Sequence, residues 1–467
     1  MDATTDLQPP LLADPSWGGH IRATLKLGLP LIAAQLGQQA ITVTDTLMMG
    51  RLGAEPLAAG VLGTSLFFVA FIICSGFAHA IMPMAATAEG AGDTRGVRRS
   101  VRMGLWVVTG MVALLMPVLW QTEALLLLAG QDETLSKLAQ DYVRIAQWSL
   151  FPALWIMVLR SYLSALERAS IVMWAALCGV LLNILLNWMF IFGNLGAPAM
   201  GIRGAAVATL GTAFVTLAPL IAYTLRTKAL RKYQLFEHFW RPDVGAIREV
   251  LRLGAPISGT FLAEVGLFVM ASFMLGWLGT VPLAAHGIAL QVISVLFMIP
   301  LGLSSAATVR VGRALGRGDR EGLFRATVTV MTMAVSFATA AAVLLWVMPR
   351  PLIQLFLGRE EPNADEILHL GVGLLAVAAI FQLADTLQVM SVALLRGLKD
   401  TRRPMWIAIA SYWGLGVPSA YILGFTLELG GQGVWGGLAV GLTAAAALLA
   451  WRFVKREPLG LVAFDTK

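Results

Sequence analysis

Three carboxylates stand inside long apolar stretches of this 467-residue chain, namely Asp45, Glu264 and Asp385. No Lys or Arg within those stretches is an obvious partner for any of them. An ionised group at the centre of a bilayer costs about 2.5–3.5 kcal/mol on the insertion scale, so such an acid is either protonated or holds a cation, unless it only accepts hydrogen bonds for structure. Because an acid that exchanges a proton or a cation is what an ion-coupling site requires, we predict that role for these three residues.

Uncharged polar residues accompany the acids at helical spacing. Before Asp45, two glutamines and a threonine complete an i, i+3, i+7, i+10 series, which forms one polar stripe on an otherwise apolar helix. Two glutamines flank Asp385, and two asparagines four residues apart share a face of another helix. Such amides also serve as hydrogen-bonding glue between membrane helices, and this alternative stays open. The predicted cavity residues of this set are Gln38, Thr42, Asn183, Asn187, Gln382 and Gln388.

Aromatic and histidine side chains near the acids form a second set of candidates. The faces of aromatic rings attract organic cations, so we predict that Phe261, Phe268 and Phe381 line a substrate surface, with packing as the alternative. His286 could relay a proton, although a lone histidine in a membrane helix is more often a packing residue. These four residues complete the predicted cavity.

The composition predicts a polytopic membrane protein. Hydrophobic residues make up 58% of the chain and charged residues 13%, with a mean hydropathy of +0.76, whereas soluble domains carry ~25% charged residues. Apolar runs of ~20 residues match a ~30 Å hydrocarbon core. No secretory signal precedes the first run, so we expect it to remain as a membrane helix. The twelve predicted spans are residues 27–49, 58–81, 103–121, 143–164, 171–193, 204–225, 253–276, 283–305, 326–348, 370–392, 405–425 and 433–453.

The distribution of positive charge predicts the orientation of these spans. Of the 34 Lys and Arg residues, 28 fall on the side of the membrane that holds the N-terminus. The positive-inside rule therefore places both termini in the cytoplasm. The net charge of +7 does not indicate a nucleic-acid partner, because the basic run at 226–252 is most simply a solvated cytoplasmic face. The six basic residues on the opposite side are Arg51, Lys137, Arg144, Arg203, Arg350 and Arg359.

The chain repeats itself at an offset of 226 residues. Residues 27–59 align without a gap with residues 253–285, and the glycines and aspartate of EGAGDTRG match those of GRGDREG at the same offset. LRSYLSALERAS resembles LRGLKDTRRPM at a slightly larger offset. Six spans in each half give both halves the same orientation, which is typical of transporters with a site between two lobes near the bilayer midplane.

The predicted fold is an all-α polytopic membrane protein with twelve transmembrane helices in two pseudo-symmetric six-helix lobes. No Walker-type, HExxH or GxSxG motif and no paired-Cys metal spacing appears, so we predict neither an enzyme nor a protein with a bound cofactor. The predicted parts are a cytoplasmic N-terminal tail (1–24), an N-lobe (25–225), a cytoplasmic connector (226–250), a C-lobe (251–453) and a cytoplasmic C-terminal tail (454–467).

Several motifs together resemble a known family. They are VTDTLMMGRLGAEPLAA in the first span, LLNILLNWMFIFG in the fifth, the stretch from FLAEVGLF to PLAAHGIALQV, and FQLADTLQV followed by LRGLKDT. In this combination they resemble the multidrug and toxic compound extrusion (MATE) transporters of the NorM branch. The resemblance covers nearly all of the chain beyond residue 20, so it is a specific one.

The resemblance implies a MATE-like, V-shaped pair of six-helix lobes that exports cationic, amphipathic compounds in exchange for Na⁺ or H⁺. It implies a multi-pass protein of the bacterial inner membrane, and we expect a monomer. Glu264 and Asp385 correspond to the cation-site carboxylates of the second lobe and would hold Na⁺ if the protein is sodium-coupled. Asp45, with the two asparagines of the fifth span, corresponds to the polar site of the first lobe. Some relatives have a Tyr where this chain has Phe381, which removes a hydroxyl and leaves the coupling ion open.

Other functions are compatible with parts of this pattern. A flippase for lipid-linked saccharides shares the two-lobe plan, but it would be expected to line its cavity with Arg or Lys for a pyrophosphate. A membrane enzyme would need a pair of acids or a nucleophile with a base at a helix end. A passive channel would conduct without an ion gradient.

Overall fold

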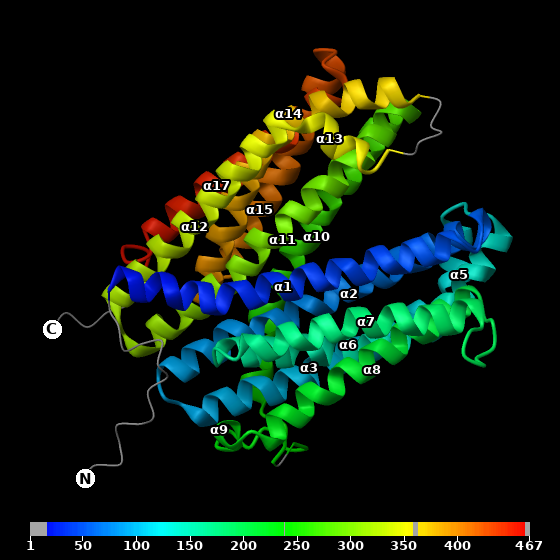
Figure 1. Ribbon diagram of the computed structural model, residues 1–467. Helices are drawn as coiled ribbons and strands as arrows, with labels where there is room; N and C mark the ends of the chain where they lie inside the picture. The colour runs from blue at the N-terminus through cyan, green and yellow to red at the C-terminus, as the bar shows by residue number, and fades with distance from the viewer. Residues whose placement is uncertain (1–15, 238, 358–362, 463–467) are drawn as a thin grey trace, which may run out of the picture. The chain divides into compact units, whose positions relative to one another are not determined.

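The computed structural model describes residues 16–237, 239–357 and 363–462 (Figure 1). Their regular structure is helical, as predicted for an all-α protein. The first half contains α1 (Trp17–Gly50), α2 (Ala54–Gly90), α3 (Thr94–Trp120), α4 (Thr122–Leu128), α5 (Glu133–Ala146), η3 (Gln147–Ser149), α6 (Leu150–Ala165), α7 (Ala169–Phe192), α8 (Ile202–Arg226) and α9 (Lys228–Arg231). The second half contains α10 (Val244–Leu278), α11 (Thr280–Arg317), α12 (Arg320–Val347), α13 (Pro349–Gln354), α14 (Ala364–Gly397), α15 (Arg402–Ile409), η4 (Ala410–Gly416), α16 (Val417–Tyr421), η5 (Ile422–Thr426) and α17 (Gly430–Val454).

Each of the twelve predicted spans falls on one of these helices or on a continuous series of them. Among the described residues, eleven helical segments are long and apolar enough to cross a bilayer, with mean hydropathies from 1.3 to 2.4. The remaining one, α1, is 34 residues long but less apolar, because its glutamines, threonines and Asp45 lower the average. Gln38, Thr42 and Asp45, which are predicted to form a site, are among the polar residues that lower it. Parts of the predicted tails (1–15 and 463–467) and Arg359 lie outside the described residues.

The internal repeat is confirmed in three dimensions. Asp93 and Asp319 lie 226 residues apart, and each caps the helix that follows it. Their carboxylates accept the backbone N–H of Gly96 at 2.8 Å and of Gly322 at 2.7 Å. The glycine before each acid has a φ of +73° or +67°, in the left-handed region that a residue without a Cβ adopts at low cost. The two halves therefore turn from their second into their third span in the same way.

Two close helix crossings also follow the repeat. A Cβ on Gly302 of α11 would lie 2.6 Å from Cα of Ile32 on α1, and a Cβ on Gly76 of α2 would lie 2.7 Å from the carbonyl oxygen of Gly254 on α10. Gly76 and Gly302 are 226 residues apart, so the same glycine lets the backbones approach in each half. At the second crossing the Ser258 hydroxyl also donates to the Ile73 carbonyl at 2.6 Å.

The described residues divide into two compact units. One contains residues 16–32 and 259–462, and the other contains residues 33–258. Their boundaries fall inside α1 and α10, the two helices that begin the repeats. The lobes at 25–225 and 251–453 stay a division predicted from the sequence.

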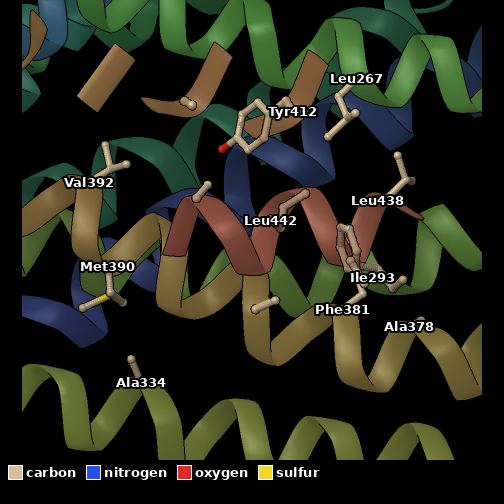
Figure 2. Packing of buried hydrophobic residues seen from close by; sticks show 14 of the residues in the cluster. Leu267, Ile293, Ala334, Ala378, Phe381, Met390, Val392, Tyr412, Leu438 and Leu442 are labelled. Carbon is tan, nitrogen blue, oxygen red and sulfur yellow. The ribbon is translucent and has the colours of Figure 1, made fainter. Parts of the chain in front are cut away.

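The unit of residues 16–32 and 259–462 has a core formed mainly by α11, α12, α14 and α17, which lie side by side (Figure 1). Figure 2 shows part of this core, in which Phe381 of α14 lies close to Ile293 of α11 and to Leu438 of α17. Tyr412 belongs to the same buried cluster, and its side chain comes from η4, a π-helical turn. Such turns are rare and often occur at functional sites.

Candidate functional site

Glu264 and Asp385 lie on helices that run antiparallel. The rings of Phe268 on α10 and Phe381 on α14 are 5.9 Å apart. A second contact joins Phe261, seven residues before Phe268, to Arg396, fifteen residues after Phe381, with the guanidinium 5.4 Å from the ring centroid. Glu264 lies one turn from Phe268, and Asp385 lies one turn from Phe381 in the same direction. The structure therefore brings the two predicted acids together, and their charges interact.

Asp385 is surrounded by buried polar atoms that lack a hydrogen-bond partner among the described residues. Its own Oδ1 is one of them, and both amide atoms of Gln382 and the Oε1 of Gln388 are others. Buried polar groups in folded proteins are nearly always hydrogen-bonded, so several such atoms around one acid indicate a place for water, a proton or a cation. The hydroxyls that share this property on neighbouring turns are those of Thr386, Ser411 and Tyr412.

The sequence reasoning missed Tyr412. Its side chain is fully buried, and its hydroxyl is close enough to Glu264 and Asp385 to interact electrostatically with both. The neighbouring Trp413 fixes this turn against α10, because its indole N–H donates to the Ala263 carbonyl at 3.2 Å. One signal was available: the chain has only six tyrosines, and Tyr412 stands inside the predicted eleventh span.

Arg396 was also missed as a neighbour of the acids. It lies eleven residues after Asp385, three helical turns along the same face, just beyond the predicted tenth span. Its guanidinium lies over the ring of Phe261, and its charge interacts with that of Glu264. Within the described residues Glu264 forms no ion pair within 4.0 Å, so the acid is influenced by Arg396 without being neutralised by direct contact.

The remaining predicted residues of the second half form an aromatic series. Phe381 lies 5.9 Å from Phe268 and 5.5 Å from Trp435, and Trp435 lies 5.7 Å from His286, measured between ring centroids. His286 is 1% exposed, with its Nε2 3.0 Å from the Ser272 hydroxyl. Phe381 and His286 are packing residues in this arrangement. Phe381 lies one helical turn from Asp385. Phe261, half-buried, already holds the guanidinium of Arg396 on its face.

The structure also brings together the three polar residues predicted for the first half. Asn187 of α7 donates to Oδ1 of Asp45 at 2.6 Å, and Asn183 donates to the same oxygen at 3.0 Å. Both asparagines are fully buried, whereas Asp45 on α1 is half-buried. Thr42 and Gln38, respectively one and two turns earlier on α1, have exposed side chains. The polar stripe therefore begins on an accessible surface and ends in a hydrogen-bonded cluster.

The donor set of these sites is made of oxygens. The described residues contain no cluster of three or more His, Cys, Asp or Glu that could hold a metal ion. Two carboxylates with a tyrosine hydroxyl and amide oxygens suit a proton or a hard cation that stays briefly, because hard cations prefer oxygen ligands. This arrangement can bind and release a small positive species.

Comparisons with known proteins identify relatives of this chain. The family model MatE matches residues 30–189 and 256–422. The chain is 50% identical over 457 residues, 97% of each chain, to the "Probable multidrug resistance protein NorM" of Rhizobium meliloti (strain 1021), and 46% identical over 445 residues to the protein of that name in Agrobacterium fabrum, covering 95% of this chain and 96% of that one.

Solved structures with the same fold are more distant in sequence. An outward-facing multidrug resistance MATE family transporter superposes on this chain with a TM-score of 0.85 and 24% sequence identity. A MOP superfamily transporter from Pyrococcus furiosus superposes with a TM-score of 0.84 and 23% sequence identity. Both superpositions cover 96% of this chain and 98% of the other chain. With the family model spanning both halves and relatives near half identity over nearly the whole length, this chain belongs to the MatE family, the MATE transporters that its motifs resemble.

Proposed function

We propose that this protein is a secondary-active antiporter that exports cationic, amphipathic compounds in exchange for Na⁺ or H⁺ by alternating access. The observation that carries the proposal is the pair Glu264 and Asp385. These acids lie on facing turns of antiparallel helices, among buried oxygens without partners in the described residues and without an ion pair to either acid.

The acid pair explains how one positive species can displace another. Two like charges that interact at short range in a medium of low dielectric constant repel strongly, so an empty pair attracts any cation. Binding of Na⁺ or H⁺ removes that negative charge and weakens the attraction for a cationic compound. When the ion leaves on the opposite side of the membrane, the restored charge favours the next compound. Tyr412 supplies a neutral oxygen next to both acids, which suits the cation-bound state.

The substrate class is supported by the charge and by the relatives. A negative, partly desolvated site favours cations, and the half-buried ring of Phe268 beside it is of a kind that attracts organic ones. The relatives with 46–50% identity are named as probable multidrug resistance proteins of bacteria. We therefore propose small cationic molecules as its substrates and a bacterial inner membrane as its location.

The test is efflux by the purified protein in proteoliposomes, with Na⁺ and pH gradients imposed separately. The wild-type protein should move a fluorescent organic cation under one or both gradients, and Glu264→Gln and Asp385→Asn should each abolish the dependence on the gradient. Asp365→Asn, which removes an exposed acid from the start of α14, is the matched control and should transport normally. Undiminished transport by both site variants would remove the coupling role from these acids.

A further inference from the structure

The chain between α9 and α10 runs along α3 toward the middle of that helix and then returns. Near its start, Arg98 donates to the Gln234 side chain at 3.1 Å, and at its end Arg99 pairs with Asp243 at 2.5 Å. Between these two points, the carbonyl of Phe239 accepts the indole N–H of Trp106 at 3.0 Å. Trp106 lies seven residues beyond Arg99, about 10 Å further along the helix. The middle of this segment therefore lies just inside the cytoplasmic edge of the predicted third span, which begins at Met103.

This segment, residues 234–237 and 239–243, carries an aromatic cluster at its deepest point. Phe239 has ring centroids within 6.4 Å of those of Phe236, Trp240, Trp106 and Trp155. The clustered rings fix the turn against α3 and α6. We call this segment the aromatic wedge.

The polar backbone of the aromatic wedge is paired by side chains of α3. The carbonyl of Phe239 is satisfied by Trp106, and that of Glu237 accepts from Arg102 at 3.4 Å. Irregular backbone is tolerated at membrane depth only where its polar groups find partners within the protein. These bonds are what a loop needs in order to enter the boundary between headgroups and acyl chains.

Exposed apolar side chains lie at the tip of the wedge and directly after its last residue. Trp240 is 80% exposed and Val244, the first residue of α10, is 75% exposed. Indole rings are enriched at the level of lipid headgroups, where the ring is buried and its N–H stays hydrated. An exposed indole beside a half-buried aromatic cluster at this level is suited to contact lipid.

Positive charge in and on either side of the wedge along the chain exceeds the charge of its acids. The wedge has two acids: Glu237 forms an ion pair with Arg98 at 3.9 Å, and Asp243 forms one with Arg99. The exposed basic residues nearby form no ion pair within 4.0 Å with a described acid. Their surplus charge complements an anionic surface. They are Arg226, Lys228, Arg231, Lys232, Arg241 and Arg248.

We propose that the aromatic wedge is a binding surface for anionic phospholipids, with the Trp240 ring in the headgroup–acyl boundary and the surrounding Lys and Arg on lipid phosphates. The positive charge and the position of Trp240 beside Trp106 together favour a lipid over a soluble acidic partner. Such a partner would bind the cations but would not account for an exposed ring at the level of Trp106. Each basic residue near an anionic membrane surface contributes about 1 kcal/mol, equivalent to roughly fivefold in affinity.

The test measures binding of fluorescent phosphatidylglycerol and phosphatidylcholine to the purified full chain in detergent. We expect phosphatidylglycerol to bind more tightly, and the triple variant Arg231→Gln, Lys232→Gln and Arg241→Gln to weaken that binding by about 100-fold while leaving phosphatidylcholine unchanged. The matched control removes three exposed cations from the second half, as Arg402→Gln, Arg403→Gln and Lys455→Gln. An equal loss in the control would overturn the proposal.

A second measurement separates a lipid from other anions. In nanodiscs with brominated lipid, Trp240→Ala should remove a part of the tryptophan fluorescence that the lipid quenches. Trp174→Ala, which removes an exposed ring from α7, is the control, and the quenched fluorescence that it removes should not depend on phosphatidylglycerol. If heparin or inorganic phosphate displaces the fluorescent lipid as well as unlabelled phosphatidylglycerol does, or if Trp240→Ala leaves the quenching unchanged, the surface binds anions without recognising a membrane and the proposal is wrong.

Discussion

Trp435 donates its indole N–H to Nδ1 of His286 across 3.1 Å, and this single bond sets the protonation of the imidazole. An indole nitrogen can only donate, so Nδ1 must accept and the proton of the neutral ring lies on Nε2. Nε2 then donates to the Ser272 hydroxyl, which in turn donates to the Phe268 carbonyl at 3.0 Å. His286 is therefore held neutral with both nitrogens satisfied, which is the packing role weighed for it from the sequence.

Replacing Trp435 with Phe should destabilise the protein. The variant leaves Nδ1 of a buried histidine without a donor, and an unsatisfied buried group costs about 1–3 kcal/mol. A lower midpoint of thermal unfolding in detergent would show this. Trp174→Phe, at an exposed site, is the control and should leave the midpoint unchanged. An unchanged midpoint in Trp435→Phe would mean that the bond to His286 contributes little.

Substitutions at Asp45 should separate its charge from its hydrogen bonds. Asp45→Asn keeps an oxygen that can accept from Asn183 and Asn187, so the protein should remain close to wild-type stability. Asp45→Ala leaves the amide donors of two buried asparagines unpaired and should cost about 1–3 kcal/mol. Thermal unfolding of both variants gives the stabilities, and efflux gives the role of the charge. Equal stability of the two variants would contradict the arrangement described for α1 and α7.

Removing the hydroxyl of Tyr412 should affect cation binding and leave the fold intact. The hydroxyl has no hydrogen-bond partner in the described residues, so Tyr412→Phe creates no unsatisfied group. If the oxygen contacts the coupling ion, the ion concentration for half-maximal transport should rise about tenfold, as expected for a hydrogen bond to a charged group. Tyr421→Phe, at an exposed ring, is the control. A wild-type ion dependence in Tyr412→Phe would exclude this contact.

The repeat predicts that Gly76→Ala and Gly302→Ala have similar effects. Each new Cβ would meet the backbone of a crossing helix, at the Gly254 carbonyl or at Ile32, and neither backbone can move without shifting its helix. We expect each variant to lose about 1–3 kcal/mol of stability or to fold poorly. Gly110→Ala, whose Cβ meets nothing within 4 Å, should be neutral or slightly stabilising. The yield of folded protein and its thermal midpoint provide the measurement, and tolerance of one variant alone would show that the crossings are not equivalent.

The ion pair at the start of α10 should make stability depend on pH. The guanidinium of Arg99, helped by the backbone N–H of Ala246, holds the pKa of Asp243 below its usual value of 3.8. A lowered pKa in the folded state stabilises the protein above the usual pKa, and this contribution is lost as the pH falls from about 5 to about 2. The pair is partly exposed, so it should contribute only about 0.2–1 kcal/mol.

Asp243→Asn should therefore be less stable than wild type at neutral pH, and its stability should fall less on acidification. Asparagine is also a good helix cap, so the cap on Ala246 should survive the change. Unfolding curves at neutral and acidic pH measure the difference. Asp365→Asn, an exposed acid on α14, controls for the loss of one negative charge. Parallel pH curves for Asp243→Asn and wild type would rule out the ion pair as a source of the dependence.

The repeated plan and the polar residues that interrupt it could be predicted from the order of the amino acids. A long apolar run in a membrane predicts a helix, because every backbone polar group there must be hydrogen-bonded within the protein. The 226-residue offset predicted equivalent turns at Asp93 and Asp319. Spacing alone was sufficient to put Asn183 and Asn187 on one face, since both lie on a single helix.

Which helices meet, and what each polar group contacts, could not be predicted and became known from the folded arrangement. The approach of Glu264 to Asp385, the hydroxyl of Tyr412 beside them and the guanidinium of Arg396 over Phe261 all join elements far apart in the chain. The periodicity of one helix shows which face is polar, but it does not show the partner, the register or the crossing. These depend on packing between side chains whose separation along the sequence carries no local signal.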